Sequence, residues 1–107
     1  MKPNTGLNKI DTDHLLSALI RFPEIEEAII FGSRAKGNYK KGSDVDIAIK
    51  GSYIEYQTVL GLKSMLEENL PLPYFFDVIH YESINSPELK EHIDRAGKTI
   101  YSKPAST

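Results

Sequence analysis

The sequence contains no cysteine among its 107 residues. This absence excludes disulfides, thiolate nucleophiles and cysteine-based zinc sites, so any bound metal needs oxygen or imidazole ligands. No apolar run approaches the roughly 18 residues of a membrane span, and the residues after Met1 lack the apolar core of a signal peptide. We therefore expect a cytoplasmic protein without a membrane partner.

A strong excess of charge of either sign is also missing. The formal net charge of −2 and the pI of about 5.9 give no long-range attraction for nucleic acid, so we expect no direct nucleic-acid partner. A local basic patch could still bind a small phosphate ligand. The 40% of hydrophobic residues is typical of a folded chain, and the length predicts one domain, residues 1–107, with flexible ends at 1–10 and 102–107.

Hydrophobic periodicity predicts alternating helices and strands. Helices are expected at about residues 11–20, 56–66 and 87–96, and strands at 28–31, 44–49, 74–81 and, at a sheet edge, 99–101. The first helix has candidate caps at Asp11, Thr12 and Asp13, the last begins at Ser86, and Gly61 is expected to interrupt the middle one. This order predicts a small α/β or α+β sheet flanked by helices, with the loop 32–43 at its edge.

The strand at 44–49 alternates between apolar and acidic positions. Because successive side chains of a strand point to opposite faces, one face carries Val45, Ile47 and Ile49 and the other carries Asp44, Asp46 and Ala48. The two carboxylates then lie about 7 Å apart along one face, a separation that two side chains can close around a cation.

A third carboxylate, Asp77, occurs within an otherwise apolar strand, where an isolated buried charge costs several kcal/mol unless it is paired or ligated. If this strand neighbours the 44–49 strand, Asp77 completes a triad with Asp44 and Asp46. Three carboxylates holding two Mg²⁺ ions suit phosphoryl or nucleotidyl transfer, in which one ion activates the attacking hydroxyl and the other binds the triphosphate.

Gly32 and Ser33 are candidates for the phosphate end of such a site. Glycine lets the backbone approach a phosphate closely, and the serine hydroxyl and exposed N–H groups can donate hydrogen bonds to it. Arg34 and Lys36 add positive charge.

Each of these features also has a plainer interpretation. Asp44 could cap a turn, Asp46 could be a solvated strand residue, and Asp77 could be the partner of a buried ion pair. Only the combination of Gly-Ser and Asp-x-Asp at this spacing favours a site. Lys40 and Lys41 are interpreted as a solvated loop face.

The histidines and the aromatic residues at 74–76 are interpreted as structural residues rather than site residues. His14, His80 and His92 show no metal-ligand spacing, and His14 and His92 are expected on helix surfaces. The aromatic residues at 74–76 are expected to be core.

Three segments resemble the signature of the DNA polymerase β-type nucleotidyltransferase superfamily, and more narrowly its minimal nucleotidyltransferases, the MNT proteins. These segments are GSRAKG at 32–37, SDVDIA at 43–48 and FDVI at 76–79. The resemblance implies the nucleotidyltransferase fold, a mixed sheet with helices on one side, and transfer of a nucleoside monophosphate from ATP with Mg²⁺.

The resemblance also implies a role for each matching residue. Gly32 and Ser33 would hold the triphosphate, Asp44 and Asp46 would bind both metals, and Asp77 would ligate the catalytic metal and act as base. Arg34 matches the basic residue that usually follows the Gly-Ser pair.

Larger superfamily members carry an acceptor-binding domain, so here we expect the acceptor surface to come from another chain. Minimal members are commonly encoded beside a helical HEPN protein, which implies a hetero-oligomer and an antitoxin that adenylylates a tyrosine of a HEPN ribonuclease toxin. Two alternatives stay open. The protein could neutralise its partner by stoichiometric binding alone, or be a subunit of a small-molecule nucleotidyltransferase of the aminoglycoside-modifying type.

Overall fold

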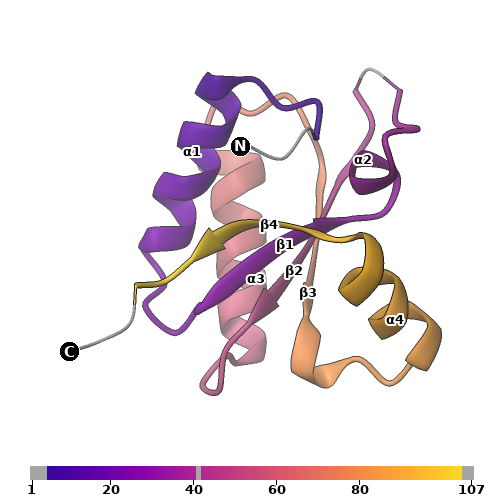
Figure 1. The fold of residues 1–107 in the computed structure, drawn as a ribbon. Helices are drawn as coiled ribbons and strands as arrows, with labels where there is room; N and C mark the ends of the chain where they lie inside the picture. The colour runs from indigo at the N-terminus through magenta and orange to yellow at the C-terminus, as the bar shows by residue number, and fades with distance from the viewer. Residues whose placement is uncertain (1–4, 41, 105–107) are drawn as a thin grey trace.

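The computed structural model describes residues 5–40 and 42–104 as a four-stranded sheet with helices on both faces (Figure 1). The strands are β1 (Glu27–Phe31), β2 (Val45–Lys50), β3 (Phe76–His80) and β4 (Lys98–Ser102). The α-helices are α1 (Lys9–Ile20), the short α2 (Ser33–Lys36), α3 (Tyr56–Ser64) and α4 (Pro87–Ala96). A π-helical turn, Met65–Asn69, extends α3, and a 3-10 turn, Tyr81–Ser83, follows β3.

The sheet is mixed, with the strand order β3-β2-β1-β4. β1 runs antiparallel to both β2 and β4, whereas β2 and β3 are parallel neighbours. The predicted α+β class is thereby confirmed, as is the predicted edge strand near the C-terminus. The condition for the acidic triad, that the two acid-bearing strands are neighbours, is met. The loop predicted at a sheet edge instead joins the two central strands, so it lies at the end of the sheet.

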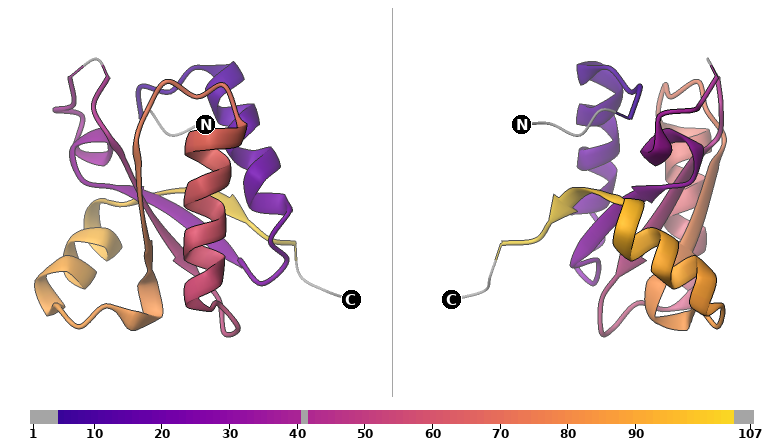
Figure 2. Two further views of the ribbon diagram at one scale, coloured as in Figure 1. Left: turned by 180° about the vertical axis from the view of Figure 1, so that it is seen from behind. Right: turned by 45° about the vertical axis from the view of Figure 1, so that its right-hand side comes forward.

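The first face of the sheet is covered by α1 and α3, which lie side by side in both views of Figure 2. Its core includes Leu15 and Leu19 from α1, Leu62 from α3 and the inward residues of β2. All three apolar residues predicted to share one face of β2 are fully buried here, so the predicted alternation is correct: Val45, Ile47 and Ile49.

The second face is covered by α4, so the expectation that the helices lie on one side is wrong. Ile29, Phe31 and Ala48 point to this face and need apolar cover, which Ile93 of α4 supplies. Close packing depends on Gly97, because a Cβ atom there would come within 2.6 Å of the Cγ2 atom of Ile29.

The expected flexible N-terminal arm is partly ordered. α1 is capped by Asn8, whose side chain accepts a 2.7 Å hydrogen bond from the Asp11 N–H, so the helix begins before the predicted caps. Thr5 is buried. Residues 1–4 of the expected arm lie outside the described residues.

The C-terminal end and α3 also differ from expectation. The Lys103 N–H donates to the Glu26 carbonyl at 2.7 Å, which orders the chain just beyond β4, while residues 105–107 lie outside the described range. Gly61 does not interrupt α3; its missing side chain leaves room for the ring of Phe22, 3.2 Å from an ideal Cβ position. Within the described residues, no helix combines the length and apolarity needed to cross a membrane.

Candidate nucleotide and metal site

Asp46 and Asp77 lie opposite each other on the parallel strands β2 and β3, and Phe31 of β1 lies opposite Asp46 on its other side. Neighbouring strands are about 4.8 Å apart, so this row of three residues crosses one face of the sheet. That face is the one covered by α4, because Phe31 belongs to its apolar cluster. The row lies where β1 ends and α2 begins (Figure 1).

Asp44 precedes β2 rather than beginning it, since the strand starts at Val45. Its side chain is exposed, as is that of Asp77, whereas Asp46 is half-buried. The Val45 N–H donates to the Phe75 carbonyl at 3.0 Å and so holds this end of β2 against the chain entering β3. Asp46 is therefore the partly enclosed carboxylate of the three, and the other two are open to solvent.

Electrostatic repulsion is concentrated on Asp46. Burial, followed by the negative charges of Asp77 and Asp44, raises the pKa of the Asp46 carboxyl above its ordinary value. A divalent cation would relieve this repulsion, and carboxylate oxygens are the kind of ligand that Mg²⁺ prefers. The residues present thus fit a magnesium site, although no group of three His, Asp or Glu side chains in the described ranges is already drawn together as ligands.

Gly32 brings the expected phosphate end of the site to this row. Its φ of 74° and ψ of −148° belong to a region that is essentially restricted to glycine. An ideal Cβ on Gly32 would lie 2.3 Å from the Asp46 Oδ2 atom, so the backbone at this turn packs directly against the carboxylate. Ser33 then starts α2, and Gly37 ends it in the left-handed conformation.

The structure does not bring the Arg34 guanidinium to this turn. Arg34 is 2% exposed, and its guanidinium donates to the Thr5 carbonyl at 2.9 Å and to the Ser43 carbonyl at 2.9 and 3.2 Å. The rings of Tyr39 and Tyr74 lie 5.0 and 4.8 Å from it. These contacts give Arg34 a structural role at the base of the loop.

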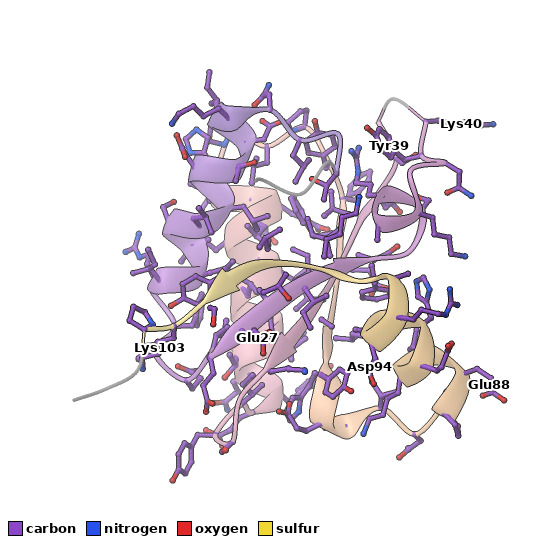
Figure 3. The ribbon with its side chains drawn as sticks, viewed as in Figure 1. Glu27, Tyr39, Lys40, Glu88, Asp94 and Lys103 are labelled. Carbon is purple, nitrogen blue, oxygen red and sulfur yellow. The ribbon has the colours of Figure 1, made fainter. Side chains whose placement is uncertain are left out.

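The other basic residues of the loop are differently placed. Lys36, at the end of α2, is exposed. Lys40 is exposed and extends outward from the loop (Figure 3), as expected of a solvated position, while Lys41 lies outside the described residues.

The aromatic residues expected in the core divide into three environments. Phe76 is buried and Tyr74 packs partly against the core, where its hydroxyl donates to Asp11 at 2.9 Å. Phe75 is 71% exposed, so that expectation is wrong for this residue. Phe75 immediately precedes β3 and lies beside a surface hollow that Gly42, Glu67 and Leu72 also line.

His92 is the site residue that sequence reasoning missed. It was expected on a helix surface, yet its Nε2 atom accepts a 3.0 Å hydrogen bond from the Gly32 N–H. Its ring also meets the Phe31 ring edge-on, with centroids 6.2 Å apart. The signal available in the sequence was its position immediately before Ile93, the buried residue of α4.

Comparison with known proteins agrees with the fold. The chain matches the family Polymerase beta, Nucleotidyltransferase over residues 13–106. No curated protein matches. One similar solved structure is a toxin–antitoxin with AMP-PNP, at 23% identity and a TM-score of 0.68, covering 91% of this chain and 75% of that chain.

Two further similar structures come from two different organisms. One is the tri-AMPylated Shewanella oneidensis HEPN toxin in complex with MNT antitoxin, at 18% identity and a TM-score of 0.68, covering 91% of this chain and 74% of that one. The other is a putative nucleotidyltransferase from Sulfolobus solfataricus, at 22% identity and a TM-score of 0.55, covering 89% and 79%. With the fold and 94 of 107 residues matched (13 to 106 inclusive), the chain belongs to the polymerase β nucleotidyltransferase family.

Proposed function

We propose that this chain transfers AMP from ATP to a hydroxyl group on a partner protein. The observation that carries the proposal is the contact of the Gly32 turn with Asp46, which lies in register with Asp77. This contact joins a backbone suited to phosphate with carboxylates suited to a divalent cation, as nucleotidyl transfer requires.

In this proposal Gly32 and Ser33 bind the triphosphate, and the exposed Lys36 adds positive charge at its edge. Asp44, Asp46 and Asp77 would hold Mg²⁺, which when bound neutralises the triphosphate and lowers the pKa of the acceptor hydroxyl. Asp77 accepts the proton of that hydroxyl. The acceptor oxygen then forms a bond to the α-phosphorus, the bond to the bridging oxygen breaks, and pyrophosphate leaves.

We propose a HEPN toxin as the acceptor, with a tyrosine as its modified residue and antitoxin activity as the outcome. Support comes from two of the similar structures, which are described as a toxin–antitoxin with AMP-PNP and as an AMPylated HEPN toxin in complex with MNT antitoxin. The exposed ring of Phe75, two residues from Asp77, also suits contact with a protein surface.

The test is to purify the chain together with its partner and incubate the complex with Mg²⁺ and labelled ATP. Mass spectrometry should find AMP on the partner. Transfer should fall about a hundredfold or more in Asp44→Asn and Asp46→Asn, because several kcal/mol of transition-state stabilisation is lost. Asp94→Asn, an exposed position on α4 (Figure 3), is the matched control and should retain transfer.

Undiminished labelling by the Asp44 and Asp46 variants would contradict the proposed enzyme. If these variants transfer no AMP but still inhibit the partner, neutralisation is by stoichiometric binding. Labelling of small hydroxyl compounds, with none on the protein, would instead support a small-molecule nucleotidyltransferase.

A further inference from the structure

We propose that His92 is a positioning residue that holds the Gly32–Ser33 turn in the shape that binds nucleotide. The inference rests on the proposed nucleotide site at this turn and adds a residue to it from the far end of the chain. The Gly32 N–H donates to the His92 Nε2 atom at 3.0 Å across 60 residues of sequence.

The contact adds to the hydrogen bonds that hold Gly32 at the start of α2, where its carbonyl accepts from the Ala35 and Lys36 N–H groups at 3.1 Å each. Gly32 lies at φ 74° and ψ −148°, and a glycine without constraint also populates other regions freely. Among the described residues, the Gly32 N–H has one hydrogen-bond acceptor, the His92 Nε2 atom. Because Nε2 accepts this bond, the proton of the neutral ring is on Nδ1.

The His92 ring is itself held in place. Ile93, its neighbour on α4, is 2% exposed and packs against the second face of the sheet, which sets the rotation of the helix. The Phe31 ring meets the His92 ring at an interplanar angle of 74°, an edge-to-face arrangement. The packing of α4 against the sheet thereby fixes the position of the His92 ring beside the turn that follows β1.

Gly32 is thus constrained on two sides. Its N–H is bonded to His92, and its Cα faces the Asp46 carboxylate, with 2.3 Å between the Oδ2 atom and an ideal Cβ position. The orientation of Ser33 relative to the acidic row follows from these two contacts. Without the hydrogen bond to the His92 Nε2 atom, the turn samples more conformations. Nucleotide binding then has to order the turn, which lowers the affinity.

The first experiment needs no nucleotide. Nitrogen-15 NMR of the full chain should place the His92 proton on Nδ1 and show a scalar coupling between the Gly32 nitrogen and Nε2 across the hydrogen bond. A proton on Nε2, or no coupling, would overturn the inference. This measurement is independent of variant folding and of the proposed activity.

The second experiment compares His92→Gln, which keeps an acceptor near the Nε2 position, with His92→Leu, which has none. His92→Leu should speed hydrogen exchange of the Gly32 amide and weaken binding of AMP-PNP with Mg²⁺, each by about threefold to tenfold, as expected for one lost hydrogen bond. His92→Gln should recover most of both. His14→Leu, on the half-buried α1 histidine, is the control and should change neither.

Three results would overturn the positioning role. They are unchanged Gly32 exchange in His92→Leu, tighter AMP-PNP binding by that variant, and a His92→Gln variant no better than His92→Leu. Failure of the unsubstituted protein to bind AMP-PNP would overturn the proposed function itself, while the Gly32 exchange rates would still report whether His92 holds the turn.

Discussion

Gly32 and Asp46 are packed so closely that a Cβ atom on residue 32 would force the carboxylate to move. An ideal Cβ on Gly32 would lie 2.3 Å from the Asp46 Oδ2 atom, and the positive φ of 74° adds strain for any other residue. The identity of this residue therefore controls the position of the carboxylate as well as the shape of the turn.

Gly32→Ala should destabilise the fold by about 1–3 kcal/mol, the cost of forcing alanine into this backbone region, and should displace the Asp46 carboxylate. AMP transfer should fall more than stability alone explains. Gly37→Ala is the matched control, because Gly37 also has a positive φ, of 84°, but nothing lies within 4 Å of its ideal Cβ. Urea unfolding and transfer assays on both variants measure the difference; equal losses of transfer would contradict the contact with Asp46.

Arg34 links three segments by contacts that depend on its planar guanidinium. It donates to the carbonyls of Thr5 and Ser43 and lies against Tyr74. Arg34→Lys should therefore lower the free energy of unfolding by about 1–3 kcal/mol, because an ammonium keeps the charge but loses the fork and leaves buried carbonyls unpaired. Thermal or urea unfolding measures this loss.

Lys36→Met is the comparison for Arg34→Lys. Lys36 is exposed at the end of α2, so its replacement should leave the unfolding free energy within about 0.5 kcal/mol and weaken AMP-PNP binding modestly. If the Arg34→Lys protein is as stable as the unsubstituted protein but binds nucleotide more weakly, Arg34 is instead a phosphate-binding residue.

Local patterns were sufficient to predict the strands and the acidic face of β2. Alternation in β2 separates Val45 and Ile47 from Asp46, and this was visible in the sequence because one face of the strand is core. The parallel register that sets Asp77 opposite Asp46 could only be predicted conditionally, since strand order is not encoded in either strand. That these carboxylates bind metal stays a prediction.

Contacts between distant segments could not be predicted. His92 is amphipathic and lies at a half-buried helical position, and nothing in α4 alone shows that a turn 60 residues earlier donates to it. Arg34 was interpreted from its neighbour Ser33, whereas its environment is set by Thr5, Tyr39 and Tyr74, which converge only in the fold. Short motifs predict residue types for chemistry, but the tertiary contacts decide which of them are structural.

Glu67 fixes the start of the strand that carries Asp77. Its Oε2 atom accepts from the Phe76 N–H at 2.7 Å and from Lys63 at 3.0 Å, and Lys63 also donates to the Phe76 carbonyl. The hydrogen bond from the Phe76 N–H, and then Lys63, hold the pKa of the Glu67 carboxyl below its ordinary value. The π-helical turn thus closes the outer edge of β3 just before Asp77.

Glu67→Gln should reduce the unfolding free energy by about 1 kcal/mol at pH 7, because a charged acceptor becomes neutral. A lowered pKa in the folded state means that the stabilisation is present above the unfolded pKa of about 4.3 and is lost as pH falls through the folded pKa. The variant and the unsubstituted protein should therefore converge in acid. Urea unfolding from pH 3 to 7 measures this, with the exposed Glu68→Gln as control; a difference that persists unchanged at pH 3 would contradict a charge effect.

On the proposed function, we predict that Phe75 contacts the acceptor protein. Phe75 is 71% exposed and lies two residues before Asp77, so Phe75→Ala should change the unfolding free energy by no more than about 0.5 kcal/mol. The KM for the partner protein should rise about fivefold to thirtyfold, as for an interface residue whose truncation costs 1–2 kcal/mol, while AMP-PNP affinity stays the same.

Tyr53→Ala is the matched control for Phe75→Ala. Tyr53 is 80% exposed, but it lies beyond the end of β2, whereas Asp46 lies near the start of that strand. Loss of the Tyr53 ring should therefore leave the KM for the partner unchanged. Steady-state transfer assays with both variants separate a contact beside Asp77 from a general effect of removing an exposed aromatic ring. Equal KM values for the two variants would place the acceptor elsewhere, whereas weaker AMP-PNP binding by Phe75→Ala alone would assign the ring to the nucleotide.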